Sequence, residues 1–338
     1  MALSRTSSVG VLLLSAVATL ALLAPFIAPH GPGDLFPDRT YAPPMRIHLH
    51  DAAGLHLPFV YRQVLEGRLL HKYDVDRTSR VPLRWLARGH LVSVDPADGP
   101  LLLLGADDLG RDVFSRLLLG ARLSLGVTIA GVMGALLLGV IAGGLAGSLG
   151  GAVDRALMLV ADFIIVLPGA YLVLVLRGVM PLVLTEWQVF RLMAALFAVA
   201  AWPHVARGVR AIVAVERGRD YVMAARAAGA GPVRVLLHLL PAARGFLGVE
   251  IVLLIPTLLV AEATISYLGL GFPEPAASWG LMLQQASNVP VMATAPWILA
   301  PAAALFVVVL GVQLAGASRA PATVLQLGRA VDSRVPRR

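Results

Sequence analysis

Two long stretches without any charged residue constrain this chain more than any other feature of its sequence. Residues 123–153 form an uncharged run of 31, and residues 275–318 form one of 44. A helix of about 20 apolar residues is long enough to cross a bilayer. Only 14% of the 338 residues are charged and 58% are hydrophobic, whereas soluble domains carry about 25% charged residues. The sequence therefore predicts an all-α polytopic membrane protein.

Six transmembrane helices are predicted from the apolar segments. In chain order they cover roughly residues 9–28, 121–145, 156–176, 191–207, 246–268 and 295–314. In the second segment, Gly139, Gly143 and Gly147 recur every four residues and form a small face suited to close helix packing. The fourth segment is short, so its flanking residues Arg191 and Arg207 are expected to snorkel towards the membrane surface.

The segment between the first two helices has a different composition. Between residues 30 and 100 there are eight acidic and nine basic residues, which indicates a soluble, external insert with a small β component. Residues 46–57 alternate and then turn, a pattern that predicts a β-hairpin. The expected domains are an N-terminal transmembrane helix (1–30), a periplasmic insert (31–104), a core of five transmembrane helices (105–318) and a basic cytoplasmic tail (319–338).

Arginines in the short loops predict the orientation. Residues 210–244 contain six arginines and two acids, and residues 319–338 contain five arginines and one acid. Loops rich in Lys and Arg stay in the cytoplasm. Both termini are therefore expected in the cytoplasm, which agrees with an even number of spans. Arginine-rich cytoplasmic segments also account for the net charge of +8, so nucleic acid is not expected as a partner.

Composition also excludes some chemistry. Without cysteine, the chain has no disulfide and no thiolate metal site. Its single lysine, Lys72, is followed by Tyr73, so the Gly-Lys-Ser/Thr of a phosphate-binding loop is impossible. Any ATP-driven process needs an ATPase on another chain, and no cofactor is expected in this one.

The polar loop contains a short predicted helix that begins with Asp220 as its N-cap and ends at Gly229. The residues Ala224 and Ala225 would give it a flat surface that fits the groove of another protein. A simple helical linker between two spans is the alternative. The candidate docking residues are Asp220, Tyr221, Met223, Ala224, Ala225, Arg226, Gly229 and Pro241.

This loop resembles that of the inner-membrane permease subunits of binding-protein-dependent ABC importers. Their signature is Glu-Ala-Ala, three residues, Gly, and a Pro about twelve residues after the glycine. Ala224, Ala225, Gly229 and Pro241 match it, and Met223 replaces the glutamate. The resemblance implies that the loop forms a coupling helix seated in a separate ATPase that binds ATP and Mg.

Two further motifs are similar to those of C-type permeases in dipeptide, oligopeptide and nickel importers. Residues 105–112 match Gly-Thr-Asp-x-x-Gly-Arg-Asp, with alanine in place of threonine, and include Asp108, Gly110, Arg111 and Asp112. Residues 261–280 match the segment Leu-Gly-Leu-Gly…Ser-Trp-Gly. The acids and the arginine of the first motif can pair at the membrane surface. Two roles are considered for this motif: it anchors the second helix, or it acts as a gate.

The resemblance implies a subunit of the bacterial inner membrane that performs no covalent chemistry. It would form half of a translocation pathway for peptides or, alternatively, nickel. The implied partners are a second permease subunit in a heterodimer, two ATP-binding subunits, a periplasmic solute-binding protein and membrane lipid. A self-sufficient secondary transporter is disfavoured because no inverted repeat is evident. A membrane enzyme is disfavoured because no catalytic constellation is evident.

Two acids within the predicted spans call for an explanation, because carboxylates are costly inside a membrane. Asp162 and Glu262 are expected to pair across helices or, alternatively, to line a water-filled pathway; a proton relay is less favoured without a chain of histidines. His48, His50 and His56 are interpreted as surface histidines, because no fourth zinc ligand follows at a typical spacing. No metal site is expected.

Overall fold

The computed structural model describes residues 5–51, 54–67, 72–87, 89–167, 184–287 and 289–317. Contacts divide the chain into two compact units, and each is described by itself. Unit 1 comprises Met1–Leu14, Val127–Ala261 and Val308–Arg338, and unit 2 comprises Ser15–Gly126 and Glu262–Val307.

Five helical stretches among the described residues are long and apolar enough to cross a membrane. They contain the helices α1 (Arg5–Ile27), α2 (Val113–Leu149), α5 (Glu186–Glu216), α8 (Arg244–Tyr267) and α11 (Ala300–Gly316). The predicted third span begins as α3 (Gly151–Val166), but its second half, with Pro168 and Gly169, lies outside the described residues. A multi-pass helical membrane protein is thus evident, whereas the predicted number of six spans stays a prediction.

The predicted bounds of the fourth span are wrong. Helix α5 has 31 residues, so Arg191 and Arg207 lie within it instead of at its ends, and the polar loop begins only after Glu216. A capping box defines its start, because Thr185 and Gln188 exchange hydrogen bonds. Pro203 is accommodated inside the helix. The prediction failed because it treated each arginine as a helix boundary.

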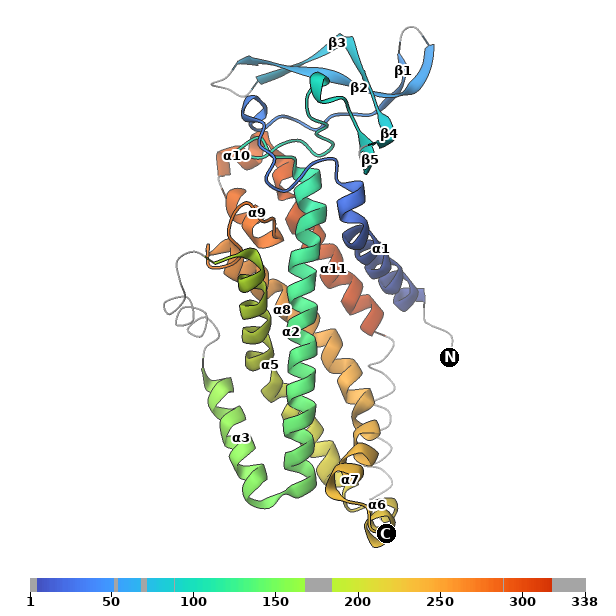
Figure 1. The fold of residues 1–338 in the computed structure, drawn as a ribbon, viewed down its shortest axis with the longest axis vertical. Helices are drawn as coiled ribbons and strands as arrows, with labels where there is room; N and C mark the ends of the chain where they lie inside the picture. The colour runs from blue at the N-terminus through green and yellow to red at the C-terminus, as the bar shows by residue number, and fades with distance from the viewer. Residues whose placement is uncertain are drawn as a thin grey trace, which may run out of the picture. The chain divides into compact units, whose positions relative to one another are not determined.

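In unit 1, α2 packs closely on α5 through its glycine face (Figure 1). A Cβ atom added at Gly139 would lie 2.4 Å from Val205, and one at Gly143 would lie 2.3 Å from the carbonyl oxygen of Ala206. At Gly147 it would lie 2.8 Å from the carbonyl oxygen of Arg210. Because only glycine permits this approach, the predicted role of the small face is confirmed.

Unit 1 also contains the segment that joins α5 to α8. It comprises α6 (Asp220–Ala227), α7 (Pro232–Leu239) and the 3-10 turn η3 (Leu240–Ala243). Helix α7 buries Val235 and Leu239 and exposes Leu237. The segment that joins α5 to α8 is therefore largely helical.

Unit 2 contains a three-stranded antiparallel sheet and a separate two-stranded one (Figure 1). The first has the order β1 (His48–Asp51), β2 (Gly54–Gly67) and β3 (Lys72–Pro82), and the second pairs β4 (Arg84–Ala87) with β5 (His90–Ser93). The segment expected to form a hairpin gives β1 and β2, which pair antiparallel. Buried apolar side chains from β2, β3 and the following chain form a core: Val60, Val81, Leu83, Val94 and Leu101.

Short helices complete unit 2. They are the 3-10 turns η1 (Pro37–Arg39), η2 (Pro96–Asp98) and η4 (Pro296–Leu299) and the helices α9 (Trp279–Gln285) and α10 (Val289–Thr294). The N-cap Ser278 starts α9, since its hydroxyl accepts a hydrogen bond from the N–H of Leu281 at 3.2 Å. This unit positions the charged motif described next.

Candidate functional site

Arg111 stands at the centre of a charge network in unit 2. Its side chain is 1% exposed, and its Nε lies 2.7 Å from the Asp107 carboxylate. One terminal nitrogen lies 3.3 Å from Asp108, and the other lies 3.2 Å from Glu274. Three carboxylates therefore surround one guanidinium, and one of them comes from a distant part of the chain.

A tight turn fixes the geometry of Asp107. Its carboxylate accepts hydrogen bonds from the backbone N–H groups of Leu109, at 3.0 Å, and Arg111, at 2.9 Å. Gly110 occupies a positive φ of 78° within the turn, and a Cβ there would lie 2.0 Å from the carbonyl oxygen of Phe36. The glycine of the motif is thus required both for the turn and for close backbone packing.

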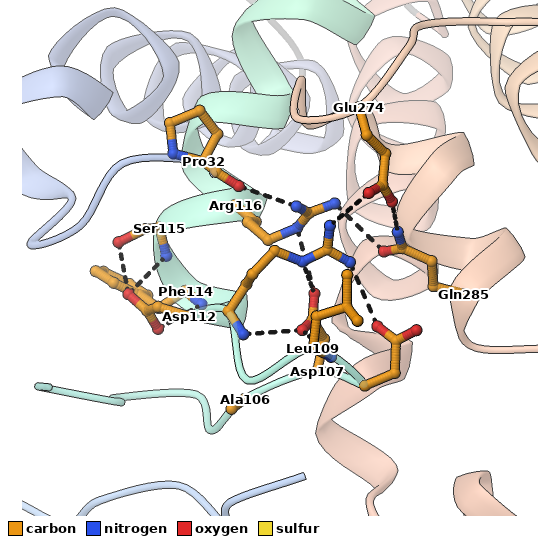
Figure 2. Close-up of polar contacts among 12 residues, drawn as sticks. Pro32, Ala106, Asp107, Leu109, Asp112, Phe114, Ser115, Arg116, Glu274 and Gln285 are labelled. Atoms are coloured by element: carbon orange, nitrogen blue, oxygen red, sulfur yellow. Dashed lines mark hydrogen bonds and ion pairs between the residues drawn. The ribbon is translucent and has the colours of Figure 1, made fainter. Parts of the chain in front are cut away.

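A second buried arginine extends the network. Arg116, on the first turn of α2, donates to the carbonyl oxygen of Pro32 at 2.9 Å and to Gln285 at 3.3 Å (Figure 2). Gln285 in turn donates to Glu274 at 2.5 Å. The network therefore ties the start of α2 to the segment around α9.

Asp112 has a different role from its neighbours. It immediately precedes α2 and accepts hydrogen bonds from the N–H groups of Phe114 and Ser115, at 3.1 Å each, and from the Ser115 hydroxyl at 2.5 Å. It is thus the N-cap of α2. Burial raises the pKa of its carboxyl to about 7, although these hydrogen bonds favour the ionised form.

Burial and the neighbouring Asp107 also raise the pKa of Asp108, while the positive charge of Arg111 opposes them. Burial by itself disfavours the charged form of Arg111, but Asp107 and Glu274 raise its pKa above the ordinary value. The arginine accordingly stays charged. Chemically, the arrangement holds two chain segments together by charge, and it supports an anchoring role more directly than a gating one.

Glu262 lies in a second buried polar cluster of unit 2. Its side chain is fully buried, and the Ser266 hydroxyl, one helical turn further along α8, donates to it at 2.8 Å. Ser124 of α2 and Ser278 lie beside this carboxyl group, whose Oε2 is buried without a hydrogen-bond partner among the described residues. Serines of α2, α8 and the start of α9 therefore enclose the acid, while pairing across helices and lining of a pathway both stay predictions.

Asp162 lies in unit 1 and forms an ion pair with Arg207 of α5. Eight residues before Asp162, Asp154 of α3 binds Arg210 of α5, with Nη2 and Oδ2 2.6 Å apart. Charges thus link α3 to α5 twice. Arg207, which was expected to snorkel towards the membrane surface, forms its ion pair with an acid on the neighbouring helix.

The predicted docking residues lie together on α6 and its surroundings in unit 1. Tyr221 and Met223 expose 46% and 53% of their surface, while Val222 between them is buried. Gly229 has a positive φ of 82°, and the N–H of Ala230 donates to the carbonyl oxygen of Ala225 at 3.0 Å. The helix therefore ends in a Schellman-type turn.

The remaining predicted docking residues differ in position and in exposure. The helix begins at Asp220, so this residue lies in the first turn and is not the N-cap that the sequence predicted. Ala224 is exposed and Ala225 is partly exposed, whereas the side chain of Arg226 lies outside the described residues. Pro241 is the second residue of the turn η3, which precedes α8.

Several residues of these clusters were not singled out from the sequence. They are Ser124, Glu274, Ser278, Trp279 and Gln285. The only available signal was the Leu-Gly-Leu-Gly…Ser-Trp-Gly motif of residues 261–280, which contains Glu274, Ser278 and Trp279. Nothing local to Ser124 or Gln285 distinguishes them from ordinary polar residues on a helix.

Comparison with known proteins defines the class. The family described as binding-protein-dependent transport system inner membrane component matches residues 135–318, more than half of the chain. The chain belongs to this family and is a membrane-embedded permease subunit of an ABC importer. The resemblance to C-type permeases is thereby confirmed.

Its relatives include permeases for different substrates. The chain is 36% identical to the oligopeptide transport system permease protein OppC of Bacillus subtilis (strain 168), over 63% of this chain and 68% of that protein. It is 38% identical to the nickel transport system permease protein NikC of Escherichia coli (strain K12), over 63% and 75%. It is 36% identical to a putative peptide permease of Brucella ovis, over 63% and 69%.

One solved structure is also similar. An inward-facing structure of the MetNI methionine ABC transporter aligns with a TM-score of 0.49 and 20% identity, over 61% of this chain and 94% of that chain. The assignment rests on the sequence family and not on this likeness.

Proposed function

We propose that this subunit forms one half of a peptide-translocation pathway in the bacterial inner membrane and is driven by separate ATPase subunits through α6. One observation carries the coupling proposal. The short helix exposes Tyr221 and Met223, and it ends at Gly229, which has a positive φ. It therefore presents a small, partly apolar surface. Such a helix fits a groove on another protein.

The rest of the assembly follows from this role. A second permease subunit completes the pathway, two ATPases bind ATP and Mg, and a solute-binding protein delivers substrate on the periplasmic side. The arginine-rich segments support a cytoplasmic location for α6 and both termini, with residues 31–104 on the periplasmic side. Opening and closing of the two halves would alternate access to the pathway.

Peptide is favoured over nickel as the substrate. The relatives include oligopeptide and putative peptide permeases alongside nickel permeases. Nickel remains the second candidate because the nickel permease is as similar in sequence.

Reconstitution tests the proposal. The subunit, its cognate second permease and two ATPases are placed in proteoliposomes with the cognate solute-binding protein. Uptake of labelled tri- to pentapeptides and of radioactive nickel is then measured with ATP, and a Walker-lysine variant of the ATPase serves as the control. ATP-dependent peptide uptake is expected. Uptake of nickel alone would reassign the substrate, and uptake independent of ATP would favour a secondary transporter.

A further inference from the structure

The three-stranded sheet of unit 2 carries a cleft of about 830 Å³. Its walls include Arg46, Arg77 and Arg80, and its other polar lining residues include His48, Tyr61 and Gln63. The volume lies within the range of about 300–1,000 Å³ typical of ligand sites. None of the family motifs described above contributes to it.

The charges in this cleft do not balance. Asp51, its carboxylate, is already engaged by Arg80 and by the His56 ring, whose Nε2 lies 3.0 Å from Oδ1. Arg46 and Arg77 form no side-chain hydrogen bond or ion pair with any residue that the structure describes. The cleft therefore presents two guanidinium groups that lack a counter-charge from the described chain.

Neutral polar atoms in the same wall also lack partners. Gln63 is 3% exposed, and its amide nitrogen donates to the carbonyl oxygen of Pro43 at 2.9 Å. Its Oε1, and Nδ1 of His48, are buried without a hydrogen-bond partner within the described part of the chain. Buried polar atoms are nearly always hydrogen-bonded in folded proteins, so a ligand that supplies donors would complete this wall.

We propose that this cleft binds an acidic peptide segment. Carboxylates of the segment pair with Arg46 and Arg77, because a guanidinium matches the carboxylate geometry with two parallel donors. Backbone N–H groups of the segment donate to Gln63 Oε1, which has no partner within the described part of the chain. The inference goes beyond the proposed transport function and rests on the cleft alone. The segment belongs either to a free peptide or to an acidic loop of a partner protein.

Binding to the full chain in lipid nanodiscs tests this proposal, with three tetrapeptides that carry an uncharged BODIPY label. The first is Glu-Glu-Ala-Ala with an amidated C-terminus, the second is Ala-Ala-Ala-Ala with a free carboxylate, and the third is the same alanine peptide amidated. Fluorescence anisotropy should show saturable binding of at least one carboxylate-bearing peptide and none of the third. Binding of the second indicates a free peptide end as the ligand, whereas binding of the first alone indicates acidic side chains such as those of a protein loop.

Substitutions locate the binding. The double variant R46Q/R77Q should bind at least tenfold more weakly than the wild type. Arg84→Gln is the matched control, because Arg84 is exposed, lies outside the cleft and pairs with Asp95 at 2.8 Å; its affinity should stay within twofold. An absence of saturable binding, or equal affinity in R46Q/R77Q, would overturn the proposal.

A second variant covers the case in which R46Q/R77Q does not fold. R46K/R77K keeps both charges but loses the guanidinium fork, so its binding should weaken while still responding to salt. Raising NaCl from 50 to 500 mM should weaken wild-type binding at least fivefold. Salt-independent binding by the wild type would contradict a carboxylate site. The transport assay uses a different readout, so the two proposals can fail separately.

Discussion

The backbone N–H of Trp279 donates a 3.1 Å hydrogen bond to Oγ of Ser124, and its indole N–H donates to the carbonyl oxygen of Leu117 at 3.0 Å. A single tryptophan thus joins the start of α9 to two turns of α2. The next residue, Gly280, permits the same segment to approach α8. Packing and hydrogen bonding together fix this part of unit 2.

We expect Gly280→Ala to destabilise the protein by about 1–3 kcal/mol, because overpacking forces the surroundings to shift. The added Cβ would lie 2.4 Å from the carbonyl oxygen of Ala263. Gly245→Ala is the matched control, since Gly245 also lies in a helix, α8, and a Cβ added there has no atom within 4 Å. Thermal unfolding in detergent, followed by circular dichroism, measures both. Equal melting temperatures for the two variants would contradict the packing.

Arg111→Gln should cost about 3–5 kcal/mol of stability, because it removes the cation closest to the buried Asp107 carboxylate. Arg84→Gln removes an exposed ion pair and should change stability by less than about 1 kcal/mol. Chemical unfolding of the purified variants compares the two. A mild effect of Arg111→Gln would show that the network contributes little to holding its segments together.

Stability should depend on the protonation of Asp112. Its folded pKa of about 7 lies above the ordinary 3.8, so the folded state binds the proton more tightly than the unfolded state. The contribution of Asp112 to the free energy of unfolding should therefore be largest below about pH 4. It should fall as the pH rises to about 7, by at most about 1.4 kcal/mol per pH unit. Melting temperatures at pH 5 and pH 8 measure the loss.

Asp112→Asn is the control for this pH dependence. Its single side-chain oxygen still accepts part of the capping hydrogen bonds, but the side chain does not titrate, so the difference between pH 5 and pH 8 should shrink. A variant with an undiminished pH difference would assign the effect to another group.

Gly229→Val should uncouple ATP hydrolysis from uptake, because a β-branched residue at a φ of 82° is strained by about 1–3 kcal/mol. No atom lies within 4 Å of an added Cβ at either Gly229 or Gly231, but Gly231 has an ordinary φ of −68°. Gly231→Val is therefore the matched control. Reduced ATP-dependent uptake by the first variant alone is expected in proteoliposomes; normal uptake by Gly229→Val would refute the coupling role.

Met223→Glu should weaken docking of the cognate ATPase roughly tenfold, about 1.4 kcal/mol. The exposed methionine predicts an apolar partner surface, where a carboxylate would be buried without a counter-charge. Met223→Leu keeps the side chain apolar and should bind nearly as well as the wild type. The affinity of ATPase for the full chain in nanodiscs measures both. Tighter binding by Met223→Glu would indicate a basic group at that contact.

The sequence predicts local features of this protein better than long-range ones. The glycine face of α2 and the left-handed glycine at 229 were evident, because spacing and residue type alone impose them. Arg111 was identified with its sequence neighbours Asp107 and Asp108, whereas Glu274 and Gln285 were not, since nothing in one sequence shows which distant segments meet.

Arginine within helices misled the prediction of span boundaries. Arg207 was expected at the end of a short span because an isolated guanidinium is costly in a membrane. The cost is reduced by Asp162, which lies 45 residues earlier in the chain. A boundary rule based on single charges cannot take such a partner into account.

These pairings also have a consequence for the order in which the protein is made. Asp154 and Asp162 emerge from the ribosome 56 and 45 residues before Arg210 and Arg207, which neutralise them. If α3 moved into lipid at once, it would carry unpaired carboxylates into an environment that disfavours them. We therefore expect the insertion machinery to retain α3 until α5 has been synthesised, and the two helices to enter the bilayer as a pair.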